Sequence, residues 1–287
     1  MAPIYQFEIS KEQAEGFRKL GYNPLELKSE QGQIADLDTK GWVAIPYESI
    51  PKGIQRKGNQ RMLIDPARLS YNPTIEEVGQ KLDLTLRNTA KDFLEREFIG
   101  DMNWFEMLRV NLALGNTTPG IREFTAYGHI LGQASKGDVK IYDASGTPIS
   151  SETCKNYRED IFGVASPWRA EWLDADFKVK NGKLYVNSNH IFEDGKLIPE
   201  NSRVLAKNTL MEGKTPGISL EDWLENPTAQ GFPRKNIKEG SLYYRAPISD
   251  NNSVARFDAD SDGAYLYCYR YPSGRYSGLG VRAVRHE

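Results

Sequence analysis

The sequence contains little of what builds a disulfide framework or a metal centre. Its two cysteines, Cys154 and Cys268, lie far apart and form no CxxC pair, so we expect two reduced, unpaired thiols. The three histidines, His129, His190 and His286, show no HxxxH or HExxH spacing that would bring them to one metal ion. These two residue types therefore predict no metal site.

Long apolar runs and a strong charge of one sign are also absent. No apolar run approaches the roughly 18 to 20 residues that span a bilayer, which excludes an integral membrane protein and predicts no membrane insertion. The net charge of -2 argues against an extended phosphate-binding surface, so we expect no nucleic-acid partner. Residues 1–10 lack the basic and apolar regions of a secretory signal, so an extracellular role would need another exit route, such as release inside a virus particle.

What the chain does have is the composition of a globular protein. Of its 287 residues, 39% are hydrophobic and 26% are charged, and a chain of this length can bury a sizeable core. No repeat, low-complexity tract or long charged linker marks a domain boundary. We therefore expect one structural unit with insertions.

Helix signals gather in the first half of the chain. Thr74 and Glu77 form a capping-box pattern, and apolar residues at three-to-four spacing follow from Val78 to Leu94, which predicts the strongest helix of the sequence. Shorter amphipathic helices are expected at four further start signals, near Asn103, after Thr118-Pro119, after Ser151 and at Ser219.

Strand signals follow in the second half. Asn181-Gly182 separates two alternating segments and is the residue pair that best tolerates a two-residue hairpin turn, and a second hairpin is expected at Asp194-Gly195. Four short segments near the C-terminus also read as strands: 242–245, 254–257, 264–269 and 279–284. Together these patterns predict an α+β fold, with helices early and a small antiparallel sheet late.

One acidic motif resembles a calcium loop. Asp258, Asp260 and Asp262 stand at alternate positions and Gly263 follows, which fits the first half of such a loop. The twelfth position would be Tyr269 instead of a bidentate glutamate, and the residues after the motif read as a strand. We therefore predict no bound metal, and a calcium-dependent carbohydrate-binding lectin is the alternative function.

No pattern in the sequence predicts an enzyme. The chain has no glycine-rich phosphate loop of the GxxxxGK[ST] type. Asp174 and Asp176 lie two apart on an expected strand, but no neighbouring nucleophile suggests acid-base chemistry, so a structural role is favoured. Cys268 has no adjacent histidine to act as its base. We predict no catalytic activity and no cofactor.

The C-terminal region is rich in tyrosine. Residues 254–282 hold five of the fifteen tyrosines of the chain, and four of them, Tyr265, Tyr267, Tyr269 and Tyr271, fall on one face of an extended segment. Tyrosine with serine, glycine and arginine is the composition of antibody-like recognition surfaces. The competing interpretation is an edge strand whose aromatic face covers the core.

The same window lacks a particular group of amino acids. Lys, Glu, Gln, Met and Trp make up 60 of the 287 residues, so a window of 29 residues should hold about six of them, yet residues 254–282 hold none. These five are the amino acids that no codon ending in a pyrimidine encodes. Such a bias is expected if asparagine codons, AAC or AAT, have been randomised at their adenines.

Segment 268–284, CYRYPSGRYSGLGVRAV, resembles the variable region of the variable proteins of diversity-generating retroelements. These are phage, prophage and archaeal-virus proteins with a C-type lectin fold. Segments 103–106, 118–124, 166–175 and 242–257 resemble further blocks of that family, in the same order. The resemblance implies a C-type lectin-like domain over residues 41–287, with 254–287 as the variable region, after an N-terminal elaboration in residues 1–40.

The resemblance also implies site residues and a biological role. Scaffold positions of the family match Phe257, Ala264, Leu266, Pro272, Ser273 and 279–282. The positions between them imply a solvent-facing ligand-binding surface made of Asp258, Asp260, Asp262, Tyr265, Tyr267, Tyr269, Arg270, Tyr271, Gly274, Arg275, Tyr276 and Gly278. Its ligand would be a protein or glycan on a host or neighbouring cell surface, and the chain would be virion-associated or displayed on a cell.

The lectin fold of this family is shared with formylglycine-generating enzymes. Their activity depends on active-site cysteines near the C-terminal strands. Here Ala283 and Val284 follow the Gly-Val-Arg segment, so the resemblance does not extend to that activity.

Overall fold

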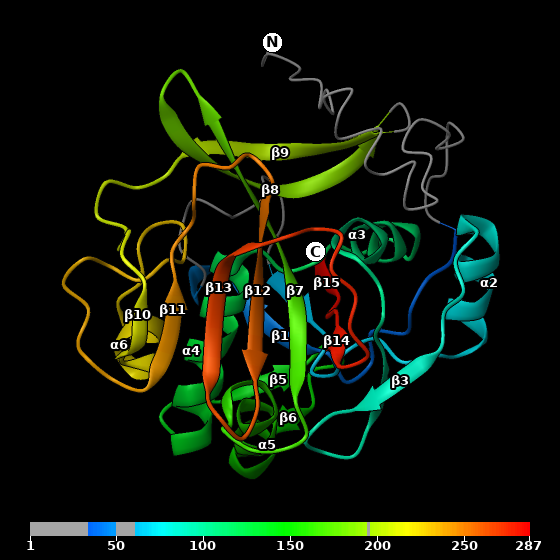
Figure 1. The fold of residues 1–287 in the computed structure, drawn as a ribbon. Coiled ribbons are helices and arrows are strands. Elements are labelled where there is room, and N and C mark those ends of the chain that lie inside the picture. The colour runs from blue at the N-terminus through cyan, green and yellow to red at the C-terminus, as the bar shows by residue number, and fades with distance from the viewer. Residues whose placement is uncertain (1–33, 50–60, 194–195) are drawn as a thin grey trace.

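The structure, a computed structural model, describes residues 34–49, 61–193 and 196–287 and shows helices packed on two main sheets (Figure 1). The predicted α+β class is confirmed. Residues 1–33 of the expected N-terminal elaboration lie outside the described residues. From residue 34 the chain packs on the body of the protein, where the Ile34 amide donates to the carbonyl of Ala113 at 2.7 Å.

The larger sheet runs in the order β10-β11-β13-β12-β7-β8-β9, with β14 beside β7. Its strands are β7 (Arg169–Lys180), β8 (Lys183–Glu193), β9 (Lys196–Val204), β10 (Lys214–Ile218), β11 (Leu242–Arg245), β12 (Ser253–Ala259), β13 (Ala264–Arg270) and β14 (Leu279–Gly280). The sheet is larger than expected and mixed, because β11 pairs with β13 and β14 with β7 in parallel. Pairings between distant segments are not encoded in local patterns.

The hairpin predicted at Asn181-Gly182 is confirmed. Both residues have positive φ, 51° and 70°, and they join β7 to β8 in antiparallel register. Strands β8 and β9 also pair antiparallel, with Glu193 opposite Lys196. The expected turn between them, Asp194-Gly195, lies outside the described residues.

The smaller sheet joins segments that are far apart in the sequence. Its order is β15-β2-β1-β5-β6, made of β15 (Val284–His286), β2 (Arg61–Ile64), β1 (Val43–Pro46), β5 (Ile141–Asp143) and β6 (Pro148–Ile149). Strands β3 (Asn88–Lys91) and β4 (Glu97–Ile99) form a separate hairpin. Because β15 pairs with β2, residues 284–286 are held against residues 62–64.

Helices form near all five predicted start signals. They are α2 (Pro73–Leu82), α3 (Trp104–Ala113), α4 (Ile121–Lys136), α5 (Ser151–Phe162) and α6 (Leu220–Glu225), and a 3-10 turn, η1, spans Tyr47–Ser49. Figure 1 shows α4 and α5 behind β7, β12 and β13. There Phe124 of α4, Phe162 of α5 and Phe257 of β12 pack with centroid separations of 5.1 to 5.5 Å.

The helix predicted after Thr74 has different bounds. Asn72 caps it instead, accepting a hydrogen bond from the Ile75 amide at 3.0 Å, and the helix ends at Leu82. Asp83 takes the left-handed conformation with φ of 56°, which stops the helix. Leu86 continues the apolar spacing and is buried, but it reaches the core from the irregular segment between α2 and β3.

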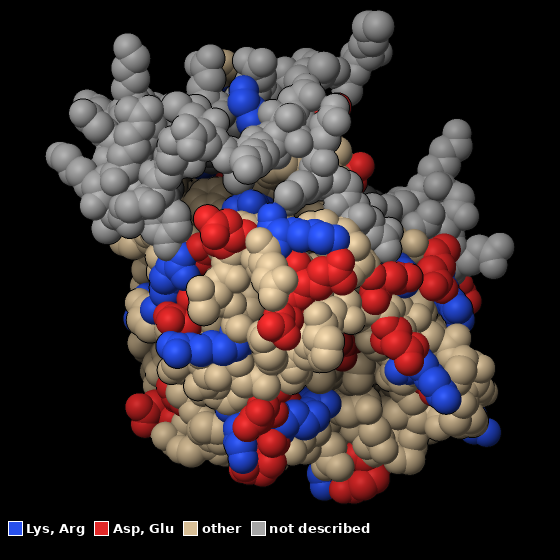
Figure 2. All heavy atoms as spheres, turned by 90° about the vertical axis from the view of Figure 1, so that its right-hand side faces the viewer, with Lys and Arg blue, Asp and Glu red and all other residues tan. Residues whose placement is uncertain are grey.

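The described residues include no helix that is long and apolar enough to cross a membrane. Figure 2 shows acidic and basic side chains interspersed over the described part of one face of the molecule. That face therefore carries no large region of one charge.

Candidate functional site

The tyrosines of β13 lie on the outer face of the large sheet. Along this strand, Leu266 and Cys268 are fully buried in the core, whereas Tyr265, Tyr267 and Tyr269 are half-buried on the other side. Because successive side chains alternate across a strand, the tyrosines point away from the core formed with α4. The predicted arrangement on one face is confirmed for these three tyrosines, whereas Tyr271 lies beyond the end of β13. The core-covering interpretation is wrong.

A tyrosine outside the predicted set completes this face. Tyr243 of β11 lies opposite Tyr265 and stacks on it with ring centroids 4.4 Å apart. Tyr265 stacks on Tyr267 at 5.4 Å, and Tyr267 meets Tyr269 edge-on at 6.0 Å. We call Tyr243, Tyr265, Tyr267 and Tyr269 the tyrosine ladder. Sequence reasoning missed Tyr243 because its place depends on the parallel pairing of β11 with β13.

Two arginines contact Tyr267, an inner ring of the ladder. The guanidinium of Arg270 lies 3.7 Å from the ring centroid of Tyr267. Arg256 of β12 is buried, and its guanidinium lies 5.3 to 5.8 Å from four ring centroids, those of Trp168, Trp172, Tyr267 and Tyr276. Such contacts between a cation and aromatic rings are attractive, and more so when they are desolvated.

Asp258 does not belong to a solvent-facing surface. Only 4% of the residue is exposed, because β12 lies between β13 and β7, and its carboxylate accepts a hydrogen bond from Arg256 at 2.6 Å. Burial raises the pKa of Asp258, although the charge of Arg256 opposes this change. The prediction that Asp258 faces solvent is wrong.

Gly278 is also buried, which corrects its placement on the surface. A Cβ atom at this position would lie 2.5 Å from the ring of Trp168 and 2.8 Å from the Trp168 carbonyl oxygen. At Gly274 the nearest atom, the Tyr271 carbonyl oxygen, would be 3.4 Å away, which is ordinary contact. Gly274 can therefore accept a side chain where Gly278 cannot.

The loop after β13 carries the most exposed rings. Tyr271 is 65% exposed and Tyr276 is 51% exposed. Arg275, between them, donates to the Asp101 carbonyl at 2.9 Å and forms an ion pair with Glu106 of α3. Arg275 therefore anchors the loop to the scaffold, while the two tyrosines stay open to solvent.

The three aspartates of the apparent calcium loop do not converge. The Asp260 side chain accepts hydrogen bonds from the amides of Asp262 and Gly263, at 2.7 and 3.0 Å, and so closes the turn between β12 and β13. Asp258 is bound to Arg256. Across the described ranges, no three side chains of His, Cys, Asp or Glu are grouped to hold a metal ion.

Asp174 and Asp176 of β7 hold a buried histidine, His190 of the neighbouring strand β8. Asp174 accepts the His190 amide at 2.9 Å and bonds the ring Nδ1, while the ring Nε2 lies 3.5 Å from Asp176. Burial lowers the pKa of His190, but the charges and hydrogen bonds of the two aspartates outweigh it and raise the pKa to about 10. The structural role favoured for this pair therefore involves a buried imidazolium, which the sequence did not indicate.

A second buried network holds Arg282, in the segment between β14 and β15. Arg282 binds Glu171 of β7 with two contacts of 3.1 and 3.2 Å, and Arg68 binds Asp160 at 2.9 Å and Glu171 at 3.3 Å. All four side chains are at most 1% exposed. The scaffold around the tyrosine ladder is therefore held rigidly.

The two cysteines are free and buried, as expected. Burial raises the pKa of the Cys154 thiol and, to a larger extent, that of Cys268. Neither thiol is favoured as a thiolate at neutral pH, and the thiolate is the nucleophilic form.

Comparisons with known proteins returned no relatives. No family model matches the chain, and searches of curated proteins and of solved structures found no match.

Proposed function

We propose that the chain is a non-enzymatic binding protein that displays a hypervariable surface on a C-type lectin-like scaffold. The observation that carries the proposal is the alternation on β13, where Leu266 and Cys268 fill the core while the tyrosine ladder lies on the outer face. A surface of this kind can change its side chains without removing core contacts. Exposed substitutions usually change the free energy of unfolding by less than about 0.5 kcal/mol.

Tyrosine gives this surface its binding capacity. Its ring supplies rigid, amphipathic contact area with little loss of conformational entropy, and tyrosine and arginine dominate the residues that contribute most to interfaces. The ladder rings already stack on one another, so they are ordered before a ligand arrives. Pre-ordered side chains lose less entropy on binding.

The structure narrows the set of positions that can vary freely. Asp258 and Gly278 are buried. Asp260 binds the backbone of its own turn, and Arg275 binds the backbone at Asp101. The remaining predicted positions form the proposed variable surface: Asp262, Tyr265, Tyr267, Tyr269, Arg270, Tyr271, Gly274 and Tyr276.

The amino-acid composition of residues 254–282, which lack Lys, Glu, Gln, Met and Trp, supports diversification directed at adenines. On this proposal the ligand is a protein or glycan on a host or neighbouring cell surface. The chain would reach it on a virion or as a cell-surface protein. Several copies displayed together would convert weak single-site binding into avidity.

A display library tests the proposal. The eight surface codons are replaced by codons with any base at the first two positions and a pyrimidine at the third, and the library is selected on unrelated proteins and glycans. A matched library randomises the buried positions Phe257, Leu266 and Cys268. We expect folded binders from the first library and mostly unfolded members in the second. Equal loss of folding in both libraries would contradict the proposal.

A further inference from the structure

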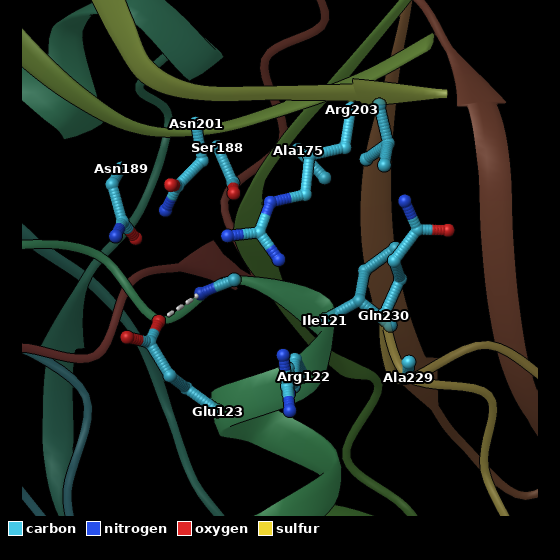
Figure 3. A pocket seen from close by; sticks show the side chains of 12 residues that line it. Ile121, Arg122, Glu123, Ala175, Ser188, Asn189, Asn201, Arg203, Ala229 and Gln230 are labelled. Atoms are coloured by element: carbon cyan, nitrogen blue, oxygen red, sulfur yellow. Dashed lines mark hydrogen bonds between the residues drawn. The ribbon is translucent and has the colours of Figure 1, made fainter. Parts of the chain in front are cut away.

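A small hollow lies at the start of α4, on the face of the sheet opposite the tyrosine ladder. Strands β7, β8 and β9 contribute Ala175, Ser188 and Arg203 to its wall, and α4 contributes Arg122 (Figure 3). Ala175 belongs to the core cluster packed with α4, which places the hollow on that side. The volume of the hollow that is open to water is about 40 Å³, which leaves room for one small charged group.

The helix end at the hollow is open. Gly120, at the N-cap position, has no side chain to accept hydrogen bonds from the first-turn amides, so the helix start lacks a side-chain cap of that kind. Glu123 binds the Gly120 amide itself at 2.7 Å. The first amides of α4 therefore keep their partial positive charge, which favours an anion at this position.

Arg122 is buried at this helix end without a partner. The residue is 8% exposed, and within the described ranges no hydrogen bond or ion pair engages it, with its Nε fully shielded. Burying an unpaired charge is strongly unfavourable. Burial lowers the pKa of Arg122 to about 10, and the nearby charge of Arg203 adds to this effect while Glu123 opposes it. Arg122 is therefore still a cation at neutral pH.

A second arginine points into the same space. In Figure 3 the guanidinium of Arg203 extends from β9 toward the start of α4. In the part of the chain that the structure describes, Arg203 has no carboxylate partner. The nearby carboxylate of Glu123 is turned toward Gly120 and His286, whose Nε2 lies 3.1 Å from it. Two guanidinium groups thus share a hollow in which the one carboxylate among the described lining residues, Glu123, is already engaged by Gly120 and His286.

We propose that this hollow binds a tetrahedral oxyanion, the phosphate or sulfate group of a small ligand. Two guanidinium groups and a helix N-terminus approach from different sides, which suits a doubly charged group with oxygens in several directions. The Ser188 hydroxyl and the Asn201 amide line the same space and add donors. The site is separate from the tyrosine ladder and does not depend on the function proposed for it.

Calorimetric titration of the full chain tests this site. Sodium phosphate, sodium sulfate and sodium acetate are titrated separately at pH 7 and constant ionic strength. We expect one saturable site for phosphate or sulfate, at least about tenfold tighter than acetate, since charge-assisted contacts are lost with a singly charged planar ion. Titrating phosphoserine and a sulfated monosaccharide then shows which group the natural ligand carries.

Variants separate the site from general surface charge. Arg203→Gln and Arg122→Gln should each weaken phosphate or sulfate binding at least about tenfold. Arg234→Gln, which removes an exposed arginine outside the hollow, should leave it unchanged. Arg203 is exposed on its strand, so that variant should fold normally. Absence of saturable binding, acetate binding as tight as phosphate and sulfate, or equal affinity of Arg203→Gln and Arg234→Gln would overturn the proposal.

Discussion

The guanidinium of Arg256 lies 5.6 Å from the ring centroid of Tyr267, its partner across β12 and β13. Arg256 is buried and donates to Asp258 at 2.6 Å, so the cation beneath the ring is itself fixed in the scaffold. Tyr267 therefore joins a rigid interior to an open surface. This relationship explains how the outer face can vary in sequence while its base stays in place.

Replacing Tyr267, Tyr269 and Tyr271 together by serine should change stability little. These rings lie outside the core, so we expect the triple variant to lose less than about 1.5 kcal/mol of free energy of unfolding in total, about 0.5 kcal/mol per residue. Leu266→Ala, on the core side of the same strand, should lose about 2 to 5 kcal/mol. Urea unfolding of both variants measures the difference. A triple variant as unstable as Leu266→Ala would show that the ladder serves the core.

Arg256→Met should destabilise the fold strongly. It leaves the carboxylate of Asp258 buried without its partner, and breaking a buried ion pair costs about 3 to 5 kcal/mol. Removing both charges in Arg256→Met/Asp258→Asn should recover most of that loss. A double variant no more stable than Arg256→Met would contradict the pairing as the cause.

Gly278→Ala and Gly274→Ala should differ sharply. An added Cβ at Gly278 would meet Trp168 at 2.5 Å, whereas at Gly274 its nearest atom is 3.4 Å away. We expect Gly278→Ala to lose about 1 to 3 kcal/mol from overpacking and Gly274→Ala to stay within about 0.5 kcal/mol. Chemical unfolding of the two variants measures this. Equal stabilities of the two variants would show that Gly278 tolerates a side chain and can belong to the variable surface.

Stability should fall as the pH rises above neutrality, because of His190. Its pKa is raised from 6.5 in the unfolded chain to about 10 in the fold, so its contribution is complete below pH 6.5 and is lost as the pH rises toward 10. Unfolding measured between pH 6.5 and 7.5 stays below the pKa values of about 8.5 and 10 at which cysteines and tyrosines titrate in the unfolded chain. The variant Asp174→Asn/His190→Gln/Asp176→Asn should lack most of this slope. An unchanged slope would show that titratable groups other than His190 cause the pH dependence of stability.

Local patterns predicted the parts of the site that depend on one strand. Alternation along 264–269 placed three tyrosines on one face, and capping residues marked the helix starts. Burial of Asp258 could not be predicted, because it depends on β12 lying between β13 and β7. Tyr243 joined the ladder through a parallel pairing across the intervening chain. Such contacts form between distant segments, and local periodicity carries no information about them.

Sequencing the DNA that flanks this gene tests the central claim most directly. The account predicts a near-copy of the 3′ end, beside a reverse transcriptase gene, with AAC or AAT at the codons for Tyr265, Tyr267, Tyr269, Tyr271 and Tyr276. Codons for the core residues Leu266 and Leu279 should be identical in both copies. Flanking DNA without such a copy, or a copy whose differences fall on core codons, would contradict adenine-directed diversification of this surface.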